Sequence, residues 1–247
     1  MSPTAPDAQR RARALVDELR ALGSADHRAG MARFGIEVER ACGVPIPTLR
    51  TLARRIGVDH ALAQALWATA LHEARLLACF VEDPAAVTAA QAEAWVDDID
   101  SWDLCDQAAT SLFDRTSVAW PKAVEWAARD EPWVRRAAFA MMAGLAVHDG
   151  RTGDEPFVAL LPLIEQAGTD DRNFVRKGVN WALRNIGKRN AALNAAALAS
   201  ARRILAGANA RAGGPRGGDA GARSARWVAT DAIRELERVA LHKWRPA

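Results

Sequence analysis

The sequence of 247 residues has no tyrosine, only three cysteines and no long apolar run. Cys42, Cys79 and Cys105 are odd in number and lack a CxxC spacing, which argues against a disulfide framework or a zinc site and predicts buried thiols in a reducing compartment. No segment approaches the roughly 18 consecutive apolar residues that a membrane span needs. The N-terminus has arginines but no apolar stretch after them, so we expect no secretory signal. These absences predict a cytoplasmic protein, associated with the nucleoid if it is bacterial, with no membrane partner.

Short motifs of several enzyme classes are missing as well. The five histidines form no i,i+4 pair and no HExxH motif, so neither a metal site nor a histidine base is indicated. No GxSxG, Walker or kinase pattern occurs. We therefore expect no metal and no cofactor.

The charges are distributed unevenly along the chain. Residues 1–150 contain 16 basic and 21 acidic residues, whereas residues 151–247 contain 17 basic and 9 acidic ones. A basic second half favours an anionic partner, most often a nucleic acid, although a merely solvated basic face is the alternative.

Nearly every segment has a helical pattern. Alanine, leucine and arginine dominate, and apolar residues recur at i, i+3 and i+4, while no alternating strand pattern of useful length appears. The sequence therefore predicts an all-α fold.

An internal repeat refines this prediction. The segment DEPWVRRAAFAMM at 130–142 aligns without gaps on DRNFVRKGVNWAL at 171–183, an offset of 41 residues, and SARWVATDAIREL at 224–236 has a similar aromatic-Val start. HEAT and armadillo arrays repeat at about 40–47 residues. We therefore predict a HEAT-like α-α solenoid with a concave basic face, in which one helix of each pair lines the concave side.

The predicted solenoid is a single domain over residues 1–247. Its N-terminal helix is expected within 1–25, frayed over 1–8, and its terminal repeat helix over 225–240. The glycine-rich stretch 207–224 carries three arginines and is predicted to be a flexible basic loop, since its glycines and its proline disfavour a helix.

Helical projection at about 100° per residue separates the residues of FVRKGVNWALRNIGKRN. Val175, Val179, Ala182, Leu183 and Ile186 share a core face. Trp181, Arg184 and Lys188 lie on the opposite side with Lys177. A tryptophan on a basic stripe suits a nucleic-acid surface, which needs cations for phosphates and a flat ring for a base or sugar. The alternative is that Trp181 packs on a neighbouring helix.

The same projection distinguishes the two arginines of WVRRAAFAMMAGLAVH. Arg136 lies opposite the apolar cluster, on a face lined by Ala140 and Ala143, where small side chains leave room for a backbone of protein or of DNA. An internal ion pair is the alternative for Arg136. Arg135, beside Met142, is predicted to be a structural arginine whose stem covers apolar surface.

In SWDLCDQAATSLF, the acids take different positions. Asp103 is predicted to be a solvated acid of the first helical turn, favoured by the helix dipole. Trp102 and Asp106 fall together at the edge of the apolar face, so Asp106 has either an arginine partner or a chemical task. In LHEARLLACF, the polar residues at 72, 73 and 75 predict a helix start with local ion pairing.

At these residues the sequence resembles the AlkD-like DNA alkylation repair family, helical HEAT-repeat proteins that include DNA glycosylases. The resemblance extends from about Gly30 to Leu236 and is carried by an ordered set of segments: MARFGI, GVPIPTLRTLARRIG, SWDLCD, WVRRAA, VNWALRNIGKRN and SARWVATDAIREL. By position it implies that Trp102, Asp106, Arg136 and Trp181 surround the damaged nucleotide.

The resemblance implies excision of purines that carry a positive charge after alkylation at N3 or N7. Asp106 would stabilise the cationic sugar, the two tryptophans would pack on the deoxyribose, and Arg136 would bind a flanking phosphate. Further expected DNA contacts are Lys177, Arg184, Lys188, Arg176 and Phe34. The implied partner is alkylated or distorted double-stranded DNA, bound by a monomer.

Two departures keep other functions open. Active relatives have a tyrosine where this chain has Phe34, so a hydroxyl contact is lost, and the glycine-rich insertion 207–224 is atypical. The family also has branches that bind DNA without excising bases. The second hypothesis is therefore that this chain is a non-catalytic protein that binds distorted or branched DNA. A protein–protein scaffold, a common role of HEAT arrays, is the third hypothesis.

Overall fold

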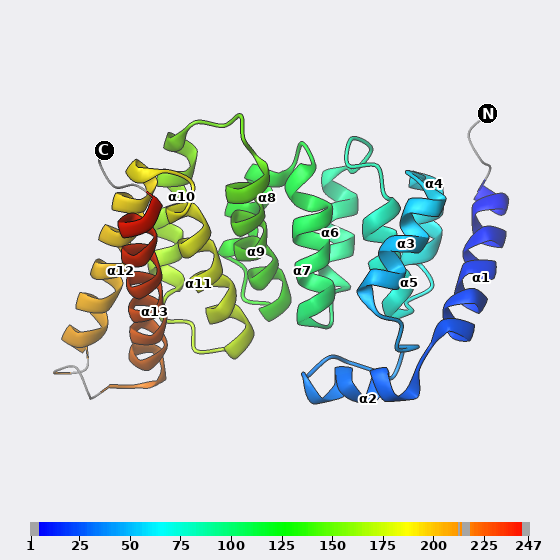
Figure 1. The fold of residues 1–247 in the computed structure, drawn as a ribbon, viewed down its shortest axis with the longest axis horizontal. Coiled ribbons are helices and arrows are strands. Elements are labelled where there is room, and N and C mark those ends of the chain that lie inside the picture. Colours follow the sequence, from blue (N-terminus) through cyan, green and yellow to red (C-terminus); the bar gives the residue numbers. More distant parts are fainter. Residues whose placement is uncertain (1–4, 212, 214–217, 244–247) are drawn as a thin grey trace. The chain divides into compact units, whose positions relative to one another are not determined.

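The computed structural model describes residues 5–211, 213 and 218–243, and in this part of the chain it contains helices and no strands (Figure 1). The described residues include no helix long and apolar enough to cross a membrane. The chain divides into two compact units, Met1–Val118 and Ala119–Ala247. The all-α prediction is thus confirmed for the described residues, and the prediction of a single domain stays a prediction.

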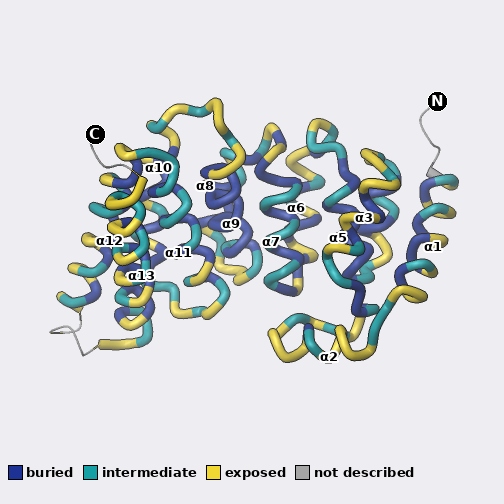
Figure 2. Tube along the Cα trace, viewed as in Figure 1, coloured by how far each residue is buried: buried dark blue, intermediate teal, exposed yellow. Residues whose placement is uncertain are grey.

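The first unit contains seven α-helices and a short 3-10 helix among its described residues. They are α1 (Ala5–Leu22), α2 (Ala25–Arg33), α3 (Ile46–Ile56), α4 (His60–Trp67), α5 (His72–Val81), α6 (Ala89–Asp97), α7 (Trp102–Ser111) and η1 (Phe113–Arg115). Helix α5 is the centre of the unit, since α1, α3, α4 and α7 all pack against it. Helix α2 differs from the rest, because Met31 is its one buried residue (Figure 2).

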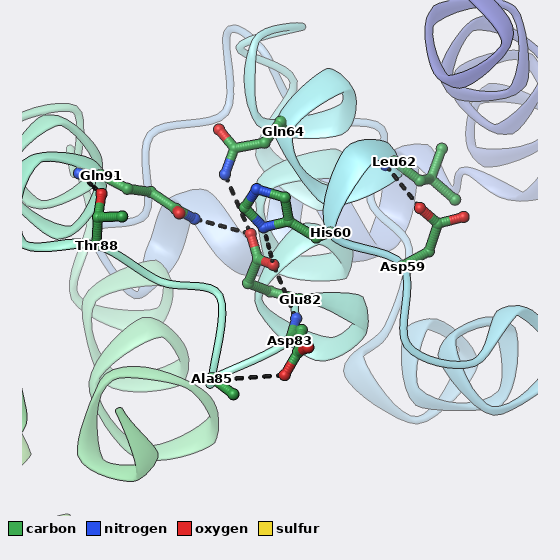
Figure 3. A network of polar contacts seen from close by, with 9 residues as sticks. All are labelled: Asp59, His60, Leu62, Gln64, Glu82, Asp83, Ala85, Thr88 and Gln91. Carbon is green, nitrogen blue, oxygen red and sulfur yellow. Dashed lines mark hydrogen bonds and ion pairs between the residues drawn. The ribbon is translucent and has the colours of Figure 1, made fainter. Parts of the chain in front are cut away.

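A buried carboxylate ties three helices of this unit together. Glu82, directly after α5, is 3% exposed and accepts hydrogen bonds from Gln64 of α4 (3.2 Å) and Gln91 of α6 (2.7 Å), and its other oxygen lies 2.7 Å from Nδ1 of His60 (Figure 3). The backbone N–H of Asp83 donates to the same carboxylate. A buried carboxylate with this many donors is fully satisfied, so we assign it a structural role.

The second unit contains six α-helices among its described residues. They are α8 (Ala119–Ala127), α9 (Pro132–His148), α10 (Asp154–Ala167), α11 (Asn173–Gly187), α12 (Ala191–Arg211) and α13 (Ala220–Lys243). Helix α9 packs on α8, α11 on α9 and α10, and α13 on α11 and α12. The pairs α8/α9, α10/α11 and α12/α13 therefore stack through their second helices, as in a HEAT-like array.

The repeated motif occupies equivalent places in these second helices. Val134, Val175 and Val228 are the valines of the three copies, and each is at most 2% exposed. The repeat therefore exists because each copy supplies the same core position to the stack, and the third, weaker copy belongs to it as well.

The predicted loop 207–224 is too long. Helix α12 continues to Arg211 and α13 begins at Ala220, so helix extends into the predicted loop from both sides. Residue 212 and residues 214–217 lie outside the described residues, as do residues 1–4 of the N-terminal stretch that was predicted to fray; residues 5–8 of that stretch are helical.

Candidate nucleic-acid interface

Trp102 and Asp106 lie one turn apart on α7. Trp102 is half-buried, and its indole N–H donates to the carbonyl oxygen of Phe34 at 3.1 Å. This bond joins the start of α7 to the end of α2, where Phe34 caps the helix. Asp106 is also half-buried, on the edge of the core face as the projection predicts. The first unit thus holds Trp102 in a defined orientation beside a carboxylate on the same helical face.

An apolar cavity of about 380 Å³ adjoins Trp102. Its walls come from α2, the start of α3, α5, α7 and the segment between α2 and α3. They include the side chains of Met31, Phe34, Ile36, Ile46, Leu76 and Trp102. Phe34 is 73% exposed, an unusual position for so large an apolar side chain. The first unit therefore brings Trp102 and Phe34, two of the predicted site residues, to one cavity.

Asp103 is not the solvated acid that the sequence predicts. Its side chain is 15% exposed, and its carboxylate lies 2.9 Å from Nε2 of His72, which is buried in α5. Burial by itself would lower the pKa of His72, but the hydrogen bond and charge of Asp103, with Glu73 and Asp100, raise it. Burial would likewise raise the pKa of Asp103, yet His72 lowers it. The two groups therefore form a charged pair.

We expect this pair to make the stability of the first unit depend on pH. The raised pKa of His72 gives a contribution that is present below about pH 6.5 and is lost as pH rises through the folded-state pKa. The lowered pKa of Asp103 gives a contribution that is present above about pH 3.8 and is lost as pH falls through its folded-state pKa.

The replacement His72→Gln should therefore lower the free energy of unfolding most between those limits, by about 2 kcal/mol near the middle of the window. Urea denaturation of both proteins across the pH range measures the difference. A cost that stays constant from acid to alkaline pH would contradict the charged pair.

The predicted interface of the second unit lies on α11. Val175, Val179, Ala182, Leu183 and Ile186 are fully buried, which confirms the projected core face. Lys177 is exposed and Trp181 is half-buried on the other side. The ammonium nitrogen of Lys177 lies 6.0 Å from the centre of the Phe174 ring. This half of α11 keeps a cation and an aromatic side chain at the surface.

Two cations of the predicted basic stripe are ion-paired instead of free. Arg184 and Lys188 both bind Glu235 of α13, and Arg184 also lies 3.6 Å from Asp231. The acids and the cations are each four residues apart, so two adjacent helices present matching pairs. The stripe is thus neutralised over the C-terminal half of α11.

Arg136 lies on a buried face of α9. It is 5% exposed, and its guanidinium donates to the carbonyl oxygen of Phe174 at 2.5 Å. Ala140 and Ala143 beside it are also fully buried, and Gly178 of α11 approaches so closely that a Cβ there would lie 3.6 Å from Cγ of Arg136. The small side chains on this face of α9 therefore accommodate the backbone of α11. Nε of Arg135 lies 3.6 Å from a carboxylate oxygen of Asp170, so Arg135 has an internal ionic partner, and the predicted packing of its stem on apolar surface stays a prediction.

Two surface residues escaped the sequence reasoning. Trp227 of α13 is 38% exposed, and the guanidinium of Arg176, itself a predicted DNA contact, lies 5.1 Å from the centre of its ring. The repeat itself could have indicated Trp227, since this residue occupies the aromatic position of the third repeat copy. In the first unit, exposed Arg50 of α3 donates to Gln107, the neighbour of Asp106, at 2.9 Å.

No three His, Cys, Asp or Glu residues gather as metal ligands within the described part of the chain. None of the three cysteines forms a disulfide within the described residues, and Cys79 and Cys105 are buried whereas Cys42 is half-buried.

Comparisons with known proteins identify relatives of this arrangement. A family model described as DNA alkylation repair enzyme matches residues 15–236. No sequence of a curated protein matches the chain. Among solved structures, one described as "a new family of proteins related to the HEAT-like repeat DNA glycosylases with affinity for branched DNA structures" superimposes with a TM-score of 0.69. The two sequences are 20% identical, and the match covers 77% of this chain and 81% of the other. This similarity shows a HEAT-like helical-repeat fold.

Proposed function

The chain belongs to the DNA alkylation repair enzyme family, and on that premise we propose that it is a DNA glycosylase that excises cationic N3- or N7-alkylpurines. The observation that carries the proposal is Asp106, a half-buried carboxylate one turn from Trp102, whose indole is fixed by the carbonyl of Phe34. The proposed partner is double-stranded DNA with an alkylated or distorted step, and the reaction proposed needs no cofactor.

Cleavage of the bond between the sugar and an alkylated purine requires mainly a negative charge held close to C1′. When the bond between C1′ and the alkylated purine breaks, its electron pair neutralises the positive charge of the base, so the leaving group needs no acid. The sugar becomes an oxocarbenium-like cation, which an ionised Asp106 stabilises. A water molecule then adds to C1′ and loses a proton. Trp102 excludes bulk water from the surroundings of Asp106, which lowers the effective dielectric constant and strengthens the attraction between its carboxylate and the sugar cation.

In the second unit we assign three roles. Lys177 contacts a phosphate, because it is exposed on α11, and Trp181 packs on deoxyribose. Arg136 is a positioning residue: it holds the carbonyl of Phe174 and thereby the start of α11. A direct phosphate contact by Arg136 would need the close packing of α11 on α9 to open.

The test of the proposal is release of free 7-methylguanine or 3-methyladenine from methylated duplex DNA by the purified protein. Detection of the free bases by chromatography answers it, with the Asp106→Asn variant as the negative control. Equal release by the two proteins would overturn the enzymatic function.

A second candidate is non-catalytic binding of distorted or branched DNA. It is favoured by Phe34, which is 73% exposed and offers no hydroxyl group, and by the affinity for branched DNA attributed to the protein of similar fold. Binding that survives Asp106→Asn, together with no base release, would support it.

The paired and unpaired cations of α11 should differ in their effect on DNA binding. We expect Lys177→Ala to reduce the slope of log affinity against log salt by about 1, because one phosphate contact is lost. Lys188→Ala should change the slope less, because Lys188 is already bound to Glu235. Fluorescence anisotropy titrations at several salt concentrations measure both slopes, and an equal loss in the two variants would contradict the assignment.

A further inference from the structure

The first unit contains an open groove that the proposed site does not use. It lies between α1, the start of α2 and the segments that precede α3 and α5, and it has a volume of about 910 Å³. Four arginines line it, Arg13, Arg20, Arg28 and Arg40, together with two acids, Asp17 and Glu39. They come from separate parts of the sequence, so the fold brings them together.

Three of these arginines carry charge that the fold does not neutralise. Arg20 lies 3.2 Å from Asp17, but Arg13, Arg28 and Arg40 are exposed and have no side-chain ion pair or hydrogen bond within the described residues. Some arginines elsewhere in this unit do have acidic partners, as Arg11 has Asp59 and Arg75 has Asp98. The excess positive charge of the groove is therefore available to an anion.

The backbone around the groove is fixed. The N–H of Ser24 donates to Gly43 O at 3.2 Å, and the N–H of His72 donates to Arg40 O at 2.8 Å. Gly43 has a φ of +83°, and a Cβ there would lie 2.2 Å from Ser24 O, so the position requires glycine. Ala70, in the wall, has a φ of 56°, which is strained for a residue with a side chain. The arginines therefore project from a pre-formed frame.

Helix α2 separates this groove from the cavity beside Trp102. Arg28 of α2 lines the groove, whereas its neighbour His27 lines the cavity. A DNA strand that contacts Trp102 on one side of α2 can therefore continue into the groove on the other side of α2. The N-terminus of α2 also lies at the groove, where Ala25 is part of the wall, but Asp26 in the first turn offsets the partial positive charge of the helix end, so the arginines supply the positive charge.

We propose that this groove binds the sugar–phosphate backbone of a DNA arm beyond the site at Asp106. Guanidinium groups match phosphate oxygens in charge and in bidentate geometry, and an open groove accommodates a continuous strand. The inference rests on the proposed function in one respect, that the partner is DNA. It adds a second contact surface, which would favour long or branched DNA over short duplexes.

The first experiment compares two double variants that lose the same charge. Arg28→Gln/Arg40→Gln removes groove cations, and Arg54→Gln/Arg151→Gln removes two exposed arginines that do not line the groove. We expect the groove variant to bind branched DNA about tenfold or more weakly and to flatten the salt slope by about 2, while the control variant binds as the wild type does. Equal affinities and slopes in the wild type and the groove variant would overturn the inference.

The second experiment uses Cys42 as a reporter inside the groove. Cys42 is half-buried in the wall, whereas Cys79 and Cys105, the remaining cysteines, are buried, so a maleimide should label Cys42 selectively in the native protein. The variant Cys42→Ser establishes the background. Saturating DNA should slow labelling of Cys42 about tenfold, and the groove variant should lose this protection.

The outcomes separate the groove from the proposed function. If the wild-type protein binds no DNA at all, both ideas fail. If it binds DNA while Cys42 stays unprotected and the groove variant binds normally, the groove inference alone fails. Polyglutamate supplies the last control: protection of Cys42 by polyglutamate as strong as by DNA would indicate an acidic protein partner and overturn the assignment to DNA.

Discussion

The variant Asp106→Asn is expected to lose about 10³-fold in the rate of base release from methylated DNA. Asparagine keeps the shape of the side chain but removes the negative charge, so the developing sugar cation loses the group that stabilises it. Losses of 10²–10³ are typical when one preorganised electrostatic group is removed from an enzyme site. Single-turnover measurement with excess protein isolates the chemical step from binding.

A matched control is available in the same segment. Asp100 is exposed just before α7, and Asp100→Asn makes the same change in charge without reaching the edge of the core. We expect it to excise bases at the wild-type rate. Both variants should bind DNA as tightly as the wild type does or slightly more tightly, since each removes a negative charge. Equal losses in the two variants would mean that net charge, and not Asp106, sets the rate.

The sequence predicts which residues are buried wherever burial depends only on the periodicity of a single helix. The buried valines of the three repeat copies and the five core residues of α11 follow from a spacing of 3.6 residues per turn, because a helix in a stack buries one face. The edge position of Trp102 and Asp106 on α7 follows in the same way. The proposed roles of those residues come from family resemblance and stay predictions.

The charged residues could not be placed from sequence, since their partners lie on other helices. His72, Glu73 and Arg75 look like a local ion-paired helix start, but they bind Asp103, the segment 42–44 and Asp98. The separations in sequence are 23 to 31 residues. A helical projection treats the helix as isolated, so a charge that faces a neighbouring helix looks the same as one that faces solvent. The partners of Arg136 and Arg184 were missed for this reason, and the DNA contacts predicted for these two residues stay predictions.

The glycine-rich segment shows the limit of composition. Gly207 lies in α12, where a Cβ would meet no atom within 4 Å, so this glycine is tolerated and not required. Alanines surround it, and their helix propensity offsets its cost of about 1 kcal/mol. Gly221 of α13 is different, because a Cβ there would lie 3.1 Å from Thr169 O. Composition predicts a loop at both glycines, but helix-forming neighbours and packing against other residues make both positions helical.

The variant Glu73→Gln is expected to lower the free energy of unfolding by about 3 kcal/mol, the largest stability loss we predict. Glu73 is fully buried in α5, and its carboxylate accepts the backbone N–H groups of Cys42 (2.9 Å), Gly43 (2.6 Å) and Val44 (3.2 Å). All three N–H groups reach Oε1, and that of Cys42 also reaches Oε2. Glutamine keeps one acceptor oxygen but removes the negative charge that strengthens these bonds, and its N–H₂ group faces the N–H of Cys42 where Oε2 accepts it. Urea denaturation measures the loss, with Glu39→Gln on the exposed part of the same segment as the control.

A second measurement separates this mechanism from general destabilisation. Burial raises the pKa of the Cys42 thiol, and the charge of Glu73 raises it further. Removing that charge lowers the pKa, so more of Cys42 is thiolate at a given pH and maleimide labelling should accelerate in Glu73→Gln under native conditions. A variant that is less stable but labels at the wild-type rate would show that Glu73 does not control this segment. Faster labelling together with weaker DNA binding would show that the fixed segment between α2 and α3 is what holds the arginines of the groove in place.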